Sequence, residues 1–178
     1  MTARVAPGSI REIGVAATAF SRLAGRVMHT EPPAVFTTLA RTRRVFWGWL
    51  VFSGSLMPFG HLSRRESELS ILRVAHLTGS TYEAAHHRRI GRRAGLTYAE
   101  IEAILGGENV VFDAREQAIL SAIDALHKRQ DLADDEWNHL RQHLNEREAV
   151  ELLMLIGQYS GLAQTLRVLR IPLDRKRD

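Results

Sequence analysis

The sequence contains no cysteine among its 178 residues. Disulfide bonds, catalysis by a thiolate and metal sites built on cysteine are therefore excluded. Long apolar runs are also missing, because none approaches the roughly 18–20 residues that a membrane-spanning helix needs. The apolar patch at residues 15–20 is short and follows a mixed segment, so it lacks the layout of a secretory signal. We expect a soluble, cytoplasmic protein with no membrane partner.

The chain has no large excess of charge of either sign. It carries 24 lysines and arginines against 20 aspartates and glutamates, a net charge of +4. This balance is compatible with nucleic-acid binding but does not argue for it, and we do not expect a nucleic-acid partner. Because 45% of the residues are hydrophobic, the chain can form one compact domain with a substantial core. We expect a single domain over residues 1–178.

Sequence signals for β-strands are missing as well. Runs of β-branched residues with a period of two are absent, while Leu, Ala, Arg and Glu dominate the composition. The fold class is therefore predicted to be all-α. Capping residues, glycines and prolines divide the chain into expected helices. These helices cover about residues 9–28, 32–43, 46–58, 63–77, 80–94, 97–106, 113–127, 134–144 and 145–170.

The last of these helices is apolar on nearly every side. A helix of this kind is either central in its own domain or covered in part by a partner subunit. Gly157 and Gly161 lie four residues apart, a spacing that would permit close approach of another helix. Both interpretations remain open, and we expect part of the apolar surface to form an interface between copies of the chain.

Three ionisable residues fall on the apolar faces of two consecutive helices. Glu68 shares a helix face with apolar residues, and Glu83 and His87 lie one turn apart on the inner face of the next helix. The joint at residues 78–79 lets the two helices fold back on each other, so Glu68 can approach His87. Buried acids and imidazoles are costly unless they are paired, and this makes the three residues a candidate site.

A Glu–His–Glu cluster of this kind has two interpretations. In an enzyme, one carboxylate orients the histidine, and the other stays protonated near neutrality, so the set moves protons at a carbon acid or a lactone. Alternatively, the cluster is a buried polar network that only fixes the packing of the helices. The spacing of Glu83 and His87 also suits a shared metal, but a full ligand set is not visible. We expect neither a metal nor another cofactor.

At these residues the chain resembles the carboxymuconolactone decarboxylase family, which includes the AhpD alkylhydroperoxidases. The AhpD pattern is Glu, eleven residues, Cys-x-x-Cys, three residues, His. Here Glu68 and His87 occupy the Glu and His positions, whereas Ser80 and Glu83 occupy the two cysteine positions. Another branch carries Tyr-Glu-Trp-x-x-His, which Tyr82, Glu83 and His87 match except at the Trp. The matching flanks are residues 69–75, Gly91 with residues 94–97, residues 115–120, the helix that contains Trp137, and residues 155–159.

The resemblance implies an AhpD-like all-helical bundle and a homo-oligomer, commonly a dimer, trimer or hexamer. It covers about residues 35–173, which leaves residues 1–34 as an amino-terminal helical extension. The family is also associated with peroxidase or peroxiredoxin activity, but that chemistry needs a thiolate and a resolving cysteine. Ser80 and Glu83 can supply neither. The resemblance therefore favours the cysteine-free Tyr-Glu-Trp branch and argues against thiol peroxidase activity.

Three classes of function remain. The first is a redox-independent enzyme of the decarboxylase, lactonase or isomerase type acting on a small organic acid, with Glu68, Glu83 and His87 as the catalytic residues. In that enzyme the substrate would be bound by Ser80, Tyr82, Tyr159 and Arg73.

The second class is a non-catalytic oligomeric binding or scaffold protein that has kept the fold and lost the chemistry. The third is a DNA-binding regulator, because residues 90–101 resemble a helix–turn–helix. The second helix of that segment carries Glu100 and Glu102 and no arginine or lysine. The phosphates of DNA would repel these acids, so the helix is poorly suited to bind DNA.

Overall fold

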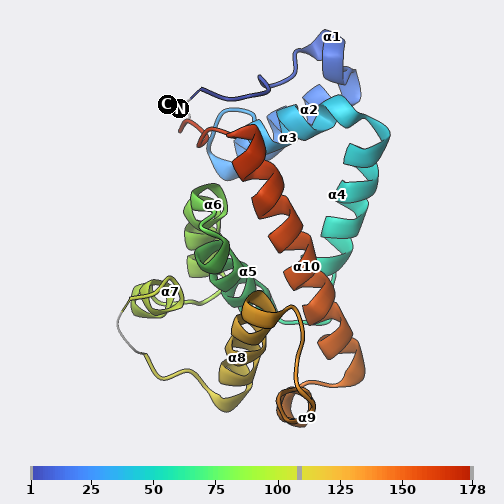
Figure 1. Ribbon diagram of the computed structural model, residues 1–178. Coiled ribbons are helices and arrows are strands. Elements are labelled where there is room, and N and C mark those ends of the chain that lie inside the picture. Colours follow the sequence, from blue (N-terminus) through green and yellow to red (C-terminus); the bar gives the residue numbers. More distant parts are fainter. Residues whose placement is uncertain (1, 108–109, 177–178) are drawn as a thin grey trace. The chain divides into compact units, whose positions relative to one another are not determined.

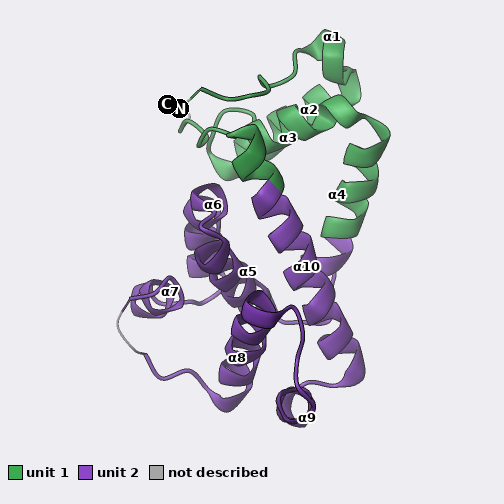
Figure 2. Ribbon diagram, viewed as in Figure 1, with its two compact units in different colours: residues 1–53, 165–178 green, residues 54–164 purple. Residues whose placement is uncertain are grey.

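The computed structural model describes residues 2–107 and 110–176. Its regular structure over these residues is helical, apart from an isolated bridge between Thr30 and Lys176, so the all-α prediction is confirmed. Within the same residues, no helix combines the length and the apolar composition that crossing a membrane requires. The chain divides into two compact units, residues 1–53 with 165–178 and residues 54–164 (Figure 2). The expected single domain, with an extension over residues 1–34, stays a prediction.

Unit 1, residues 1–53 with 165–178, is built around an aromatic cluster. Phe20 contacts both Phe36 and Phe46 edge-on, with ring centroids 5.2 and 6.0 Å apart. Ile13, Ala17 and Ala40 are buried against these rings. The helices are α1 (Ile10–Ile13), α2 (Val15–Met28), α3 (Ala34–Leu39), the 3-10 helix η1 (Ala40–Thr42) and the first part of α4 (Arg44–Leu56).

The first expected helix is interrupted in the structure. Gly14 has a φ of 84° and separates α1 from α2, so a continuous helix over residues 9–28 is wrong at this point. A left-handed backbone is easily adopted by glycine but strained for other residues, which explains the break. The helix expected over residues 32–43 is also shorter, because α3 ends at Leu39 and continues only as a 3-10 turn.

Unit 2, residues 54–164, contains the end of α4, helices α5 to α9, and α10 up to residue 164 (Figure 1). Helix α5 packs against α6, α7 and α8, and α8 packs against α9. Their bounds are α5 (Arg64–Thr78), α6 (Thr81–Arg93), α7 (Tyr98–Ile104), α8 (Ala114–Arg129), α9 (Asp134–His143) and α10 (Glu146–Leu169). The largest fully buried side chains are Leu69, Ile71, Leu72, Leu96, Ile101, Ile104, Ile119, Ile123, Leu140, Leu144 and Leu152.

Local signals fix the start and the end of α5. The Ser63 hydroxyl accepts a hydrogen bond from the Glu66 N–H at 3.2 Å, and the Glu66 carboxylate accepts one from the Ser63 N–H at 2.8 Å. This reciprocal capping box satisfies two N–H groups that the helix itself cannot pair. At the other end, Gly79 has a φ of 66° and turns the chain toward α6. The predicted boundaries of α5 are confirmed, and they set the register between α5 and α6.

Helices α5 and α6 approach each other closely at Gly91. A Cβ atom at this position would lie 3.0 Å from Leu96 Cδ1 and 3.3 Å from Leu72 Cδ1. We therefore expect Gly91→Ala to lower the free energy of unfolding by about 1–2 kcal/mol, because the added methyl group overpacks the core. Chemical denaturation measures this change.

Gly54→Ala is the matched control for this prediction. A Cβ at Gly54, which is also helical, would have no neighbour within 4 Å. Replacing an unhindered helical glycine with alanine stabilises a protein by up to about 1 kcal/mol. The two substitutions should therefore shift stability in opposite directions, and a gain in stability from Gly91→Ala would contradict the close packing of α5 on α6.

Helix α10 is only partly covered within unit 2. Leu152 and Leu155 are buried, whereas Val150 and Met154 are 54% and 48% exposed. A Cβ atom added at Gly157 or at Gly161 would have no neighbouring atom within 4 Å. A groove of about 400 Å³ lies beside α10, and its apolar lining includes Val74, Leu77, Ile123, Leu126, Leu153 and Ile156. The expected self-association of the chain stays a prediction.

Candidate functional site

Glu68 and His87 meet at the contact between α5 and α6. His87 Nδ1 lies 2.6 Å from Glu68 Oε2, and the two residues are 8% and 0% exposed. A carboxylate can only accept this hydrogen bond, so the Nδ1–H of the imidazole donates it. In the neutral ring the proton then sits on Nδ1, and Nε2 is left as the basic nitrogen. The approach expected from the two helix faces is present in the structure.

Arg64 lies on the same face of α5, one turn before Glu68. Its guanidinium nitrogen is 2.9 Å from Glu68 Oε1, and its side chain is partly exposed. The two groups form an ion pair, although Glu68 Oε1 accepts no hydrogen bond of good geometry from a described residue. Glu68 is therefore buried between a cation and a histidine, and its positive neighbour remains reachable from solvent.

Glu83 lies on α6 in a much less polar setting. It is 3% exposed, and neither carboxylate oxygen has a hydrogen-bond partner among the described residues. Burial raises the pKa of Glu83 to about 7, and the nearby Ser80 hydroxyl opposes this rise only in part. A carboxylic acid of this pKa is largely protonated below neutrality and can donate its proton there.

Tyr159 of α10 links these groups. Its ring packs edge-on against the His87 ring, with centroids 5.4 Å apart. Burial raises the pKa of Tyr159, and the negative charges of Glu68 and Glu83 raise it further, so the phenol stays neutral. Glu83 lies one helical turn before His87 on α6, and its charge, like that of Glu68, acts on this phenol. The structure thus gathers side chains from α5, α6 and α10 in one cluster.

The other residues selected from the sequence take different places. Ser80 is buried and is the N-cap residue of α6, and Tyr82 is buried with its ring 4.6 Å from the His86 ring. Arg73 is engaged elsewhere. Its guanidinium donates to both carboxylate oxygens of Asp124 at 2.6 and 2.7 Å, and also to a backbone carbonyl oxygen of α7. The arginine beside the cluster is therefore Arg64 and not Arg73.

Reasoning from the sequence does not single out Arg64, although a signal is present. Arg64 and Glu68 are separated by four residues on one helix, the spacing at which opposite charges meet. Because Arg64 falls at the first position of α5, it can be taken for an ordinary surface arginine. Over the residues that the structure describes, no three histidine, aspartate or glutamate side chains are arranged to hold a metal ion.

The segment that carries this cluster matches a known protein family. Residues 43–125, which include α5 and α6, match the carboxymuconolactone decarboxylase family. The AhpD-core, peroxidase-related protein of Ralstonia eutropha JMP134 shares the fold with a TM-score of 0.85, at 15% identity over 96% of this chain and 92% of that one. The sequence match over residues 43–125 and the shared fold support the carboxymuconolactone decarboxylase/AhpD-like family.

Other solved structures are similar to most of the chain. A protein of unknown function from Agrobacterium tumefaciens is 23% identical, with a TM-score of 0.67 over 72% of this chain and 90% of that one. A variant of the debrominase Bmp8 in complex with 2,3,4-tribromopyrrole is 14% identical, with a TM-score of 0.81 over 97% and 92%. A search of curated protein sequences gives no match. At these identities the structural likeness establishes the fold.

Within this family fold, the present chain has Ser80 and Glu83 at the positions of the cysteine pair in the AhpD pattern. The nucleophile and the resolving thiol of a peroxidase are therefore missing, since the sequence has no cysteine at all. In place of one of these sulfur atoms stands a buried carboxyl group with a raised pKa. The cluster can hold, release and accept protons, but it cannot undergo thiol redox chemistry.

Proposed function

We propose that this family member catalyses redox-independent proton transfer on a small organic acid, in a decarboxylation, lactone or isomerisation reaction. The observation that carries the proposal is the Glu83 carboxyl group, which is buried, has no hydrogen-bond partner of good geometry among the described residues, and has a pKa that burial raises to about 7. Leaving a buried polar group unpaired costs about 1–3 kcal/mol. Such a cost is typical of functional sites, where a ligand supplies the missing partner.

In this proposal the two sides of the cluster have different tasks. His87, held in its Nδ1–H form by Glu68, takes a proton from a carbon next to a carbonyl group through Nε2. In an isomerisation, Glu83, protonated below neutrality, donates its proton to the resulting enolate at a different carbon. In a decarboxylation, CO₂ leaves without this proton abstraction, and Glu83 protonates the carbanion that remains. The neutral Tyr159 hydroxyl donates a hydrogen bond to the enolate oxygen that develops between these steps.

Arg64 would bind the carboxylate of the substrate. It is the charged group of the cluster with solvent access, and its guanidinium pairs with Glu68 without an aligned hydrogen bond. We expect Arg64→Gln to raise KM about tenfold or more with a smaller change in kcat, since a charge-assisted hydrogen bond contributes about 1.5–3 kcal/mol. Steady-state kinetics on an organic acid substrate measures both constants.

Arg73→Gln is the matched control for Arg64→Gln. It removes the same charge from α5, but Arg73 is held by Asp124. We expect this variant to lose thermal stability and to keep its KM. Equal KM values for Arg64→Gln and the wild type would remove Arg64 from the site.

His87→Gln tests the proposed activity itself. We expect the variant to fold and to turn over muconolactone-type acids about 10²–10⁴ times more slowly than the wild type, because general base catalysis contributes this much. Solvent-deuterium incorporation into such acids, followed by NMR, detects proton transfer even when no net product forms. A folded His87→Gln protein with unchanged turnover or exchange would rule out this mechanism.

A non-catalytic binding or scaffold protein is the second candidate. The near-complete burial of Glu68 and Glu83 favours it, because a network closed to solvent can also serve only to fix the helices. In that case His87→Gln lowers the melting temperature, and small organic acids leave the melting temperature of the wild type unchanged. A clear ligand-induced rise would favour the enzyme.

The other two alternatives receive less support. The acids of α7 are occupied by arginines, with Glu100 bound to Arg65 at 2.6 Å and Glu102 paired with Arg88. Helix α7 itself contains no arginine or lysine, so it has no basic side chain that could bind DNA. Thiol peroxidase activity, the best-known label associated with the family, lacks the cysteine pair that it requires.

A further inference from the structure

Unit 1 is far more basic than the chain as a whole. Residues 1–53 and 165–178 contain twelve arginines and lysines against four aspartates and glutamates, a net charge of +8. Unit 2 carries twelve against sixteen, a net charge of −4, so the total of +4 hides a strong asymmetry. A concentration of positive charge on one part of a protein attracts anionic ligands. The proton-transfer cluster lies in unit 2 and does not use this charge.

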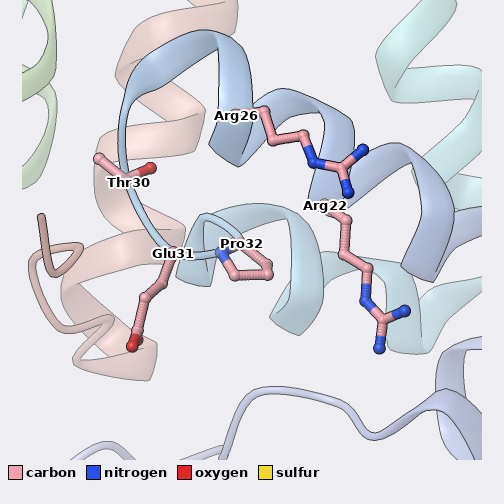
Figure 3. A pocket seen from close by; sticks show the side chains of 5 residues that line it. All are labelled: Arg22, Arg26, Thr30, Glu31 and Pro32. Carbon is pink, nitrogen blue, oxygen red and sulfur yellow. The ribbon is translucent and has the colours of Figure 1, made fainter. Parts of the chain in front are cut away.

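A pocket of about 410 Å³ lies within unit 1 (Figure 3). It is lined by Arg22, Arg26, Thr30, Glu31 and Pro32. Arg22 and Arg26 are one turn apart on α2, and both guanidinium groups extend to the same side of the helix in Figure 3. Among the described residues, neither arginine has an ion-pair or hydrogen-bond partner, in contrast to Arg41, which is bound to Glu12 at 2.8 Å.

Two further features of the pocket favour an anion. Thr30 is only 5% exposed, and its hydroxyl has no hydrogen-bond partner among the described residues, so it is a buried donor without an acceptor. Glu31 is the one acid in the lining, and its carboxylate extends away from both guanidinium groups (Figure 3).

We propose that this pocket binds the phosphate group of a small organic phosphate. Two guanidinium groups one helical turn apart match the charge of a phosphate dianion and can donate several charge-assisted hydrogen bonds to its oxygens. The volume exceeds that of a phosphate ion alone, which leaves room for an organic part against Pro32. A phosphate of this kind can belong to a soluble metabolite or to the headgroup of a lipid, and the pocket chemistry is the same for both.

Binding of glycerol 3-phosphate and of inorganic phosphate to the full chain, measured by isothermal titration calorimetry at low and moderate salt, tests this proposal. We expect glycerol 3-phosphate to bind, and the double variant Arg22→Gln/Arg26→Gln to weaken binding at least about 100-fold, about tenfold for each arginine. Glu31→Gln should strengthen binding, because it removes the acid from the lining. Circular dichroism checks that each variant is folded.

Arg11→Gln is the matched control, since it removes one positive charge from unit 1 outside the pocket lining. Its affinity should equal that of the wild type, and an equal loss in Arg11→Gln and in the double variant would overturn the proposal in favour of general electrostatic attraction. Sedimentation with phosphatidylcholine vesicles, with and without phosphatidic acid, whose headgroup is a phosphate monoester, separates the two sources. Arginine-dependent binding to the anionic vesicles alone identifies a lipid headgroup, whereas binding to neither vesicles nor soluble phosphates overturns the proposal.

Discussion

Glu83→Gln is expected to raise the free energy of unfolding at pH 8 by about 3 kcal/mol. The pKa of Glu83 is raised from 4.5 to about 7 by burial in the folded protein. Between these two values the unfolded chain releases its proton while the folded protein keeps it, so the stability of the wild type falls as the pH rises from about 4.5 to about 7. Because glutamine does not ionise, the free energy of unfolding of the variant does not fall over this pH range.

Urea denaturation of both proteins over this pH range measures the effect. The two proteins should differ by less than about 1 kcal/mol near pH 4.5, and the gap should widen up to about pH 7 and then stay constant. Glu146→Gln serves as the control, because the side chain of Glu146 is 90% exposed. A stability difference for Glu83→Gln that does not depend on pH would contradict the raised pKa.

The same substitution should lower turnover about 10²–10⁴-fold, because glutamine cannot donate the proton that Glu83 delivers. A gain in stability together with a loss of activity is characteristic of residues kept for function at the expense of the fold. A purely structural network predicts no such opposition. The pair of measurements therefore separates the enzyme from the non-catalytic family member.

Glu68→Gln has the second large expected effect. The carboxylate of Glu68 fixes the Nδ1–H form of His87 at 2.6 Å, whereas the amide N–H₂ of a glutamine can donate to Nδ1 and move the proton of the imidazole to Nε2. The basic nitrogen that the proposed mechanism uses, Nε2, is then lost. We expect turnover to fall about 10²–10⁴-fold and the free energy of unfolding to fall by about 1–3 kcal/mol.

Glu116→Gln is the matched control for this variant. Glu116 is also a buried acid, but it pairs with Arg65 at 2.6 Å, away from His87. Its replacement should reduce stability by a similar amount and leave kcat and KM unchanged. If Glu68→Gln retains wild-type turnover, the orientation of His87 by Glu68 has no catalytic role.

The sequence predicts those parts of unit 2 that depend on neighbouring residues. The capping box at Ser63 and the glycine at position 79 are local signals, and they place both ends of α5 correctly. The helical period then puts Glu68 and His87 on facing sides of two antiparallel helices, and their contact follows from the short turn between them. A site formed by consecutive helices is therefore accessible to reasoning from periodicity.

Contacts between distant segments are not accessible in this way. Arg73 finds its partner Asp124 at a separation of 51 residues, and no local pattern reveals that this arginine is already occupied. Tyr159 joins the cluster from α10, and only the packed structure shows that it lies against His87. The division of charge between the two units is equally hidden in the total of +4, because unit 1 combines both ends of the sequence.

The pH dependence of kcat/KM for the wild type and for Glu83→Gln tests the central claim most directly. If Glu83 is the proton donor, kcat/KM of the wild type on a muconolactone-type acid falls as the pH rises through about 7. The residual rate of Glu83→Gln should lack this decline. A wild-type profile that stays flat across pH 7, or an identical decline in both proteins, would contradict the account of this cluster as an acid–base site.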